Sequence, residues 1–199
     1  MINIEKIANL PPFTEFKKQY NLAFKYDQKN IEAMAISSFS KELNEVDSRF
    51  VNLKFIENKE FIFFSNFDSP KAIQFKSHEQ VSLLFYWNST NIQIRIKGVI
   101  KKISSAVSDK HFKERSNKKN ALAISSNQSK KVNSYQDVVD SYNIVLNNND
   151  LLKDRPDYWG GYGVEPYYFE FWEGDDSRLN KREAYINIDG SWVHSLLQP

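Results

Sequence analysis

A β-hairpin followed at once by a helix start constrains the fold of this chain more than any other feature. Residues 48–57 and 60–66 have the composition of strands, and the short polar turn Asn58-Lys59 between them predicts a hairpin. The pattern then changes abruptly. Ser69 is a candidate N-cap and Pro70 occupies the first helical position, which predicts a helix to about residue 77. The fold must therefore pair strands locally and accommodate a helix directly after them.

The rest of the chain predicts more strands around this hairpin. Apolar spacing indicates a helix over residues 13–24 and strands over 32–39, 81–87, 91–104, 167–172, 183–188 and 191–197. Residues 107–148 are rich in Lys, Asn and Ser and are expected to be helical or loop. We interpret residues 1–12 as an N-terminal arm and residues 13–199 as one domain. The predicted class is mainly β, a small barrel with peripheral helices.

Composition excludes several kinds of function. The chain has 199 residues and a net charge of only +2, which argues against a nucleic-acid partner, and the basic run 113–131 has no interleaved aromatic residues. It has no cysteine, so disulfides and thiolate nucleophiles are impossible. The three histidines are scattered without ligand spacing, so no metal site is expected. No stretch has the apolar length of a signal or membrane segment, and a cytoplasmic protein without a membrane partner is expected.

An anion site is the first candidate for chemistry. A helix N-terminus presents free backbone N–H groups and a positive dipole end, and Lys71 lies in that first turn, where a cation is unfavourable without a compensating anion. Arg49, on the neighbouring strand, could converge with it on one phosphate. The alternative is an ordinary capped helix with a solvated lysine and a surface arginine.

Two strands carry polar side chains that could contact a flat ring. Residues 92–97 alternate strictly, so Gln93, Arg95 and Lys97 share one face; solvent exposure is the simpler interpretation for the two cations, whereas Gln93 could hydrogen-bond a heteroaromatic ring. In residues 169–172, Glu170 and Trp172 share a face, and two arginines follow downstream. This arrangement suits a phosphorylated aromatic ligand, although aromatic strands are usually part of a core.

Eight segments in one order resemble the pyridoxamine 5′-phosphate oxidase family. They are SRFVNLK (48–54), FFSNFDSPK (63–71), LLFYW (83–87), QIRIKG (93–98), NQS (127–129), WGGY (159–162), FEFW (169–172) and RLNKR (178–182). The resemblance runs from about residue 32 to residue 199. It implies an FMN-binding split β-barrel that is active as a homodimer, with a C-terminal dimerisation region and two FMN sites at the subunit interface.

The resemblance also implies the site residues. Arg49, Phe50, Val51 and Asn52 would line the flavin, and Phe64, Ser65 and Lys71 would hold its ribityl-phosphate end. Gln93 would contact the ring region, while Gln128, Ser129, Trp172 and Arg182 would complete the cofactor site, some of them from the partner subunit. For the substrate, Lys54 and Arg115 would address a phosphate, and Arg178 would lie over a pyridine ring beside the reacting carbon.

The implied reaction is the oxidation of pyridoxamine or pyridoxine 5′-phosphate to pyridoxal 5′-phosphate, with O2 as acceptor and H2O2 as product. Asn180 stands where the family usually has a catalytic histidine, and His111 and Lys119 stand where it has a phosphate-binding tyrosine and serine. The segment ALAISS (121–126) also departs from the usual Ile-Gly-Ala-Trp-Ala-Ser. Two alternatives therefore stay open: a related flavin oxidase with a substrate of the phenazine-precursor type, and a non-catalytic flavin-binding protein.

One geometric conflict accompanies these assignments. Arg49 and Lys54 have opposite parity, so an ideal strand would point them to opposite faces. Both can serve one site only if a bulge intervenes or if the site wraps around the strand end.

Overall fold

The predicted strands pair into one antiparallel sheet in the computed structural model, which describes residues 2–199. Nine strands lie within that range: β1 (Ala33–Ser40), β2 (Glu45–Asn52), β3 (Phe55–Glu57), β4 (Glu60–Asn66), β5 (Gln80–Trp87), β6 (Ile92–Lys102), β7 (Trp159–Glu173), β8 (Lys181–Ile188) and β9 (Ser191–Leu197). The order is β2-β1-β5-β6-β7-β4-β3, with β8 pairing with β7 and β9 with β8. This agrees with the predicted mainly β class.

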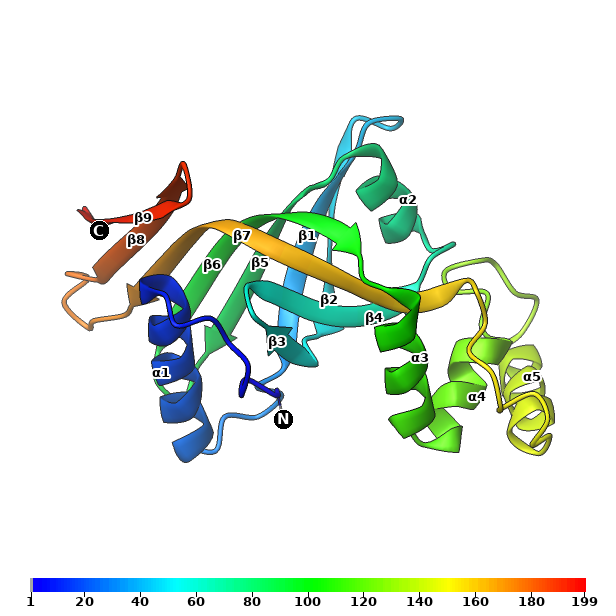
Figure 1. The fold of residues 1–199 in the computed structure, drawn as a ribbon. Helices are drawn as coiled ribbons and strands as arrows, with labels where there is room; N and C mark the ends of the chain where they lie inside the picture. The colour runs from blue at the N-terminus through cyan, green and yellow to red at the C-terminus, as the bar shows by residue number, and fades with distance from the viewer. Residues whose placement is uncertain (1) are drawn as a thin grey trace.

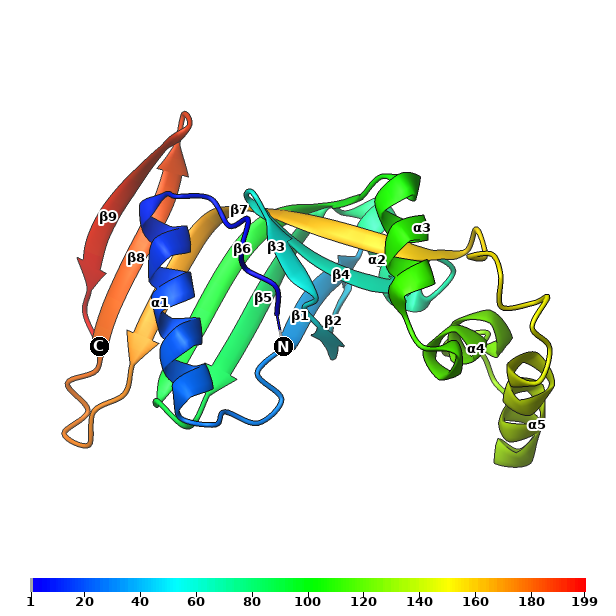
Figure 2. The same cartoon turned by 60° about the horizontal axis from the view of Figure 1, so that its bottom comes forward.

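Five helices within residues 2–199 accompany this sheet. They are α1 (Pro11–Lys25), α2 (Pro70–Ser77), α3 (Ser105–Glu114), α4 (Asn117–Ser125) and α5 (Tyr135–Leu146). Helix α1 packs beside the β8–β9 hairpin, whereas α3, α4 and α5 lie at the opposite end of the molecule (Figures 1 and 2). None of the helices within residues 2–199 has the length and apolar character needed to cross a bilayer.

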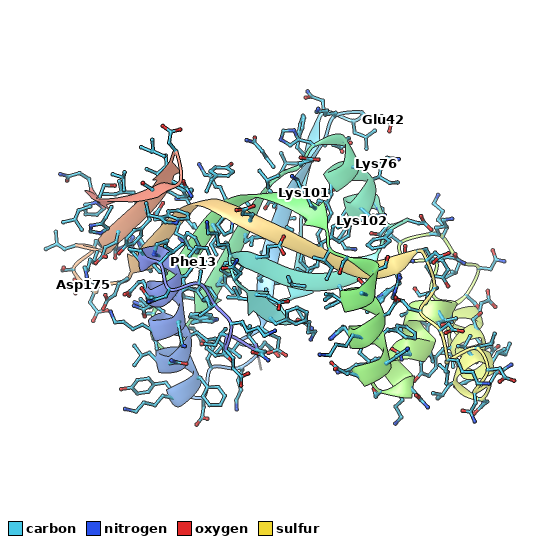
Figure 3. The ribbon with its side chains drawn as sticks, viewed as in Figure 1. Phe13, Glu42, Lys76, Lys101, Lys102 and Asp175 are labelled. Carbon is cyan, nitrogen blue, oxygen red and sulfur yellow. The ribbon has the colours of Figure 1, made fainter. Side chains whose placement is uncertain are left out.

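Aromatic packing between α1 and the sheet forms the core. Phe13, labelled in Figure 3, and Phe16 are fully buried, three residues apart on one face of α1. The ring of Phe13 meets that of Phe169 on β7 edge-on at 5.1 Å, and the ring of Phe16 meets that of Phe61 on β4 in the same way, also at 5.1 Å. The N-terminal segment adds to this core, because Ile2 is buried and Asn3 forms a parallel bridge with Phe55.

The predicted hairpin is confirmed, but the strand before it was predicted too long. Residues 48–57 form two strands, because Leu53 N–H donates to the Glu32 carbonyl beside β1, whereas Lys54 N–H donates to the Ile62 carbonyl on β4. The backbone therefore changes partner between Leu53 and Lys54. This break resolves the conflict of parity: Arg49 and Lys54 belong to different strands, and both line the same cavity.

Two further predictions need correction. The strand predicted over residues 167–172 begins at Trp159, eight residues earlier. Ser69 is the N-cap of α2 as predicted, but its hydroxyl donates to the Asn66 carbonyl and does not accept from a helix N–H. The amides of the first turn of α2 therefore have no side-chain cap within residues 2–199.

Candidate functional site

One cavity of about 970 Å³ lies between β2, β4, the start of α2, α3 and α4. That volume is large enough for a cofactor together with a small substrate. Thirteen of the predicted site residues line it, from six separate segments of the chain: Arg49, Phe50, Val51, Asn52, Lys54, Phe64, Ser65, Lys71, His111, Arg115, Lys119, Gln128 and Ser129.

The first group of cations is Arg49 with Lys71. The Lys71 side chain is buried, its ammonium donates to the Ser69 hydroxyl at 3.2 Å, and it forms no ion pair within residues 2–199. Burial, with a further contribution from the charge of Arg49, lowers the pKa of Lys71 to about 8. Arg49 is held in place by hydrogen bonds to Ser38 Oγ at 2.6 Å and Gln74 Oε1 at 3.1 Å. A buried, under-compensated ammonium beside an uncapped helix start is suited to a phosphate.

The second group of cations is Lys54, Arg115 and Lys119. None of them forms an ion pair within the described residues 2–199. Burial lowers the pKa of Arg115 to about 10, and one of its terminal nitrogens, Nη1, is buried without a hydrogen-bond partner in that range. Burial also lowers the pKa of Lys54; the charge of Glu32 opposes this shift, and the charges of Lys119 and Arg115 add to it. Among the described residues, the three cations therefore lie together without a carboxylate in ion-pair contact.

His111 connects the second group of cations to the cavity wall. Its ring stacks on that of Phe64, with centroids 3.9 Å apart and planes 17° apart. Burial and the charges of Arg115, Lys54 and Lys119 lower the pKa of His111 to about 4, so the imidazole is neutral at pH 7. A neutral imidazole has one N–H donor to offer, as a tyrosine hydroxyl would.

Two glycines of the WGGY segment bring these groups together. Gly161 pairs with Phe64, and Gly160 with Ser65, across β7 and β4. A Cβ on Gly161 would lie 2.7 Å from Ile103 Cγ1, and one on Gly160 would lie 2.7 Å from Phe67 Cζ. The absence of side chains lets α3 pack closely on β7, where Gly161 N–H donates to Ser108 Oγ at 3.1 Å. This contact positions His111 and Arg115 over the cavity.

The other five predicted residues lie away from this cavity. Gln93, Trp172 and Arg182 are directly opposite one another on β6, β7 and β8, so they form a row across one face of the sheet. Arg178 and Asn180 lie just before β8, where Asn180 Oδ1 accepts from the Asp175 backbone N–H. This end of the sheet is opposite to α3 and α4 (Figure 2). Within one chain, the predicted site residues therefore form two separate groups: thirteen line the cavity, and five lie at the other end of the sheet.

Several residues around the site were not predicted. Trp159 lines the cavity, and the Arg115 guanidinium lies over its ring at 4.3 Å. Leu122 and Ser126 also line it; they follow Lys119 by three and seven residues, so helical spacing was the signal that could have identified them. Arg95, interpreted from the sequence as solvent-exposed, forms an ion pair with the buried Glu170. No group of three or more potential metal ligands occurs within residues 2–199.

Comparison with known protein families settles the relationship. The family model for "pyridoxamine 5′-phosphate oxidase" matches residues 25–140, and that for the "pyridoxine 5′-phosphate oxidase C-terminal dimerisation region" matches residues 159–199. The chain belongs to the pyridoxamine 5′-phosphate oxidase family. Family membership confirms the predicted relationship and supports FMN as the cofactor.

Individual relatives agree with this membership. The chain is 35% identical over 202 residues to a pyridoxine/pyridoxamine 5′-phosphate oxidase of Legionella pneumophila (strain Lens), covering 98% of this chain and 91% of the relative. It is 33% identical over 191 residues to one of Synechocystis, covering 94% and 88%. These names support an oxidoreductase of this family.

Solved structures confirm the split-barrel fold. PhzG from Burkholderia lata, in complex with tetrahydrophenazine-1-carboxylic acid, matches with a TM-score of 0.89 and 26% identity over 94% of this chain and 92% of that one. A pyridoxamine 5′-phosphate oxidase-related, FMN-binding protein from Nostoc punctiforme matches with a TM-score of 0.79 and 15% identity, covering 96% and 99%. The second likeness concerns the fold alone.

Proposed function

We propose that this protein is an FMN-dependent homodimeric oxidase that converts pyridoxamine or pyridoxine 5′-phosphate to pyridoxal 5′-phosphate, with O2 as acceptor and H2O2 as product. The observation that carries the proposal is that one cavity holds two separate groups of cations, which form no ion pair within residues 2–199 apart from the Arg49–Asp47 contact at 3.4 Å. Two phosphates, one on the cofactor and one on the substrate, would occupy them.

The cofactor phosphate fits the group at the start of α2. Lys71 would supply a charge with little competing hydration, Arg49 a guanidinium already fixed by Ser38 and Gln74, and the first turn of α2 its uncapped amides. Phe50 to Asn52 continue along the same wall and would line the ring system. When bound, FMN supplies the hydride-accepting and oxygen-reactive chemistry, while the protein binds and orients.

The substrate phosphate fits the second group. Lys54, Arg115 and Lys119 would compensate a dianion, and the free Nη1 of Arg115 would gain an acceptor. Neutral His111 would donate one hydrogen bond without adding charge. Holding the phosphate at this end would orient the pyridine ring toward the cofactor end of the cavity.

The row of Gln93, Trp172 and Arg182 would complete the site from a second copy of the chain. Trp172 and Arg182 lie within residues 159–199, which match the dimerisation region of the family. The β8–β9 hairpin in this region also exposes the apolar side chains of Ile186, Ile188 and Leu196. In a symmetric dimer each copy would supply this row to its partner's cavity. Arg178 would then lie over the pyridine ring, and Asn180 could hydrogen-bond the substrate but not carry a proton.

A second candidate function is that of a related oxidase acting on a phenazine-type precursor. It is favoured by the high structural similarity to PhzG and by the departures at His111, Lys119 and Asn180. A carboxylate could occupy the second group of cations in place of a phosphate. A flavin-binding protein without turnover is the third possibility.

The visible spectrum of the purified protein, followed by turnover in the same cuvette, tests these proposals. Flavin absorbance that is lost in Lys71→Ala supports FMN binding, and a protein that takes up no added FMN contradicts it. Formation of pyridoxal phosphate and peroxide from pyridoxamine phosphate supports the first function. Turnover of reduced phenazine carboxylates alone supports the second, and a reducible flavin with no turnover of either supports the third.

A further inference from the structure

Glu170 is the one buried acidic residue within residues 2–199, and the predicted site does not use it. Its side chain is 2% exposed, on β7, in the middle of the sheet. Ionised carboxylates are rarely buried unless they are paired and hydrogen-bonded. The groups that pair with Glu170 therefore indicate its role.

Four donors from three side chains surround this carboxylate. Arg182 donates from Nε at 3.0 Å and from Nη2 at 2.8 Å to Oε1. Arg95 donates from Nη1 at 2.9 Å, and the Tyr168 hydroxyl at 2.8 Å, to Oε2. Burial alone would raise the pKa of Glu170, but these hydrogen bonds and the charges of Arg95 and Arg182 lower it, so the carboxylate is ionised.

Glu170 and its partners lie on the same face of the sheet as the row of Gln93, Trp172 and Arg182. Glu170 is two residues from Trp172 on β7, and Arg95 is two residues from Gln93 on β6, so all four side chains share one face. Arg182 pairs with Trp172 and reaches diagonally back to Glu170. The Arg182 guanidinium is thus fixed on one side by the carboxylate and on the other by the Gln198 carbonyl, which accepts from Nη1 at 2.8 Å.

We propose that Glu170 is a positioning residue: it fixes the guanidinium plane of Arg182, with Arg95 as the second ligand of its carboxylate, so that Arg182 meets the cofactor in one orientation. The cluster carries two positive charges and one negative charge, so it keeps a net positive charge beside Gln93 and Trp172. Without the carboxylate, two like-charged guanidinium groups would lie close together and turn apart. This proposal rests on the proposed function, because it assumes that Arg182 contacts FMN.

A double-mutant cycle on the full-length dimer tests this role. FMN dissociation constants are measured by flavin fluorescence quenching for the wild type, Glu170→Gln, Arg182→Lys and the double variant. Glu170→Gln is expected to weaken FMN binding by about 10- to 100-fold, since a charge-assisted contact is lost. If Glu170 acts through Arg182, the double variant should bind no more than about threefold more weakly than Arg182→Lys alone. If the losses of FMN binding free energy in the two single variants add in the double variant, the proposal is contradicted, because additivity means that Glu170 and Arg182 act independently.

Controls separate the possible failures. Glu173→Gln removes the same charge from the exposed end of the same strand and should leave FMN binding unchanged. The visible circular dichroism of bound flavin should change in Glu170→Gln and not in Glu173→Gln. If Glu170→Gln does not dimerise, the cycle is run with Glu170→Asp, whose shorter side chain cannot reach both guanidinium groups. Wild-type protein that binds no FMN overturns the proposed function; normal FMN binding by both Glu170 variants overturns this inference alone.

Discussion

The affinity for FMN should depend on pH through Lys71. In the FMN-free protein its pKa is about 8, against an ordinary value of 10.5. The difference corresponds to about 3 kcal/mol that a nearby dianion can recover by favouring the protonated amine. A bound phosphate therefore raises the pKa of Lys71, so FMN binding takes up a proton between about pH 8 and the higher pKa that Lys71 has in the complex.

The size of the change in the FMN dissociation constant follows from the fraction of Lys71 that must be protonated when FMN binds. Below pH 8 the amine is already charged, and the dissociation constant should be flat. Above pH 8 it should rise by about tenfold per pH unit, which makes binding at pH 9 about tenfold weaker than at pH 7. The phosphate itself does not contribute to this change, because its second pKa is near 6 and it is a dianion throughout.

Fluorescence titration of FMN at constant ionic strength between pH 7 and 9 measures this slope. Lys71→Met keeps the buried aliphatic length without the charge; it should bind FMN about 10- to 100-fold more weakly at pH 7 and show no slope. Lys76, exposed on the last turn of the same helix and labelled in Figure 3, provides the matched control: Lys76→Met should behave as the wild type. A flat wild-type profile, or an unchanged slope in Lys71→Met, would refute the assignment of the cofactor phosphate to this corner.

Three further outcomes are expected. Lys119→Ala should raise KM for pyridoxamine phosphate by about tenfold with kcat and FMN binding little changed, since it removes one charge from the substrate end; unchanged KM in steady-state assays would argue against that placement. Gly161→Val should lower the free energy of unfolding by about 2 to 4 kcal/mol, because its side chain would displace Ile103 and loosen α3; thermal unfolding measures this, and an unaltered Tm would contradict the packing described. Asn180→His should increase turnover of pyridoxine phosphate by restoring a group that can carry a proton; equal or lower kcat would rule out that role for position 180.

Sequence patterns predicted the elements with regular apolar alternation and failed where another constraint acts. Strands β5 and β6 were predicted to within about two residues because every second side chain is apolar. The first half of β7 was missed because Trp159 to Val164 include three glycines, which favour loops on their own. Those glycines are required by the neighbouring Ile103 and Phe67, and that contact is invisible in a local pattern.

The site residues, like the strands, were predictable where a local pattern marks them and not where distant contacts position them. The helix start and Lys71 marked the cofactor corner because a local rule about charge at helix termini applied there. Glu170 had no such marker: its two arginines are 75 and 12 residues away in sequence, and only the strand register brings them together. Family resemblance named Gln93, Trp172 and Arg182, but no pattern indicated that they lie on the far end of the sheet from Lys71.

That separation has a consequence for experiments on mixed subunits. If each active site combines the cavity of one copy with the Gln93–Trp172–Arg182 row of the other, two variants that bind FMN weakly should complement each other. A dimer of one Lys71→Met chain and one Arg182→Ala chain would carry both lesions in one site and none in the other. Co-refolding the two proteins, at an FMN concentration that leaves each variant inactive alone, would then restore activity to about a quarter of the wild-type level for random pairing.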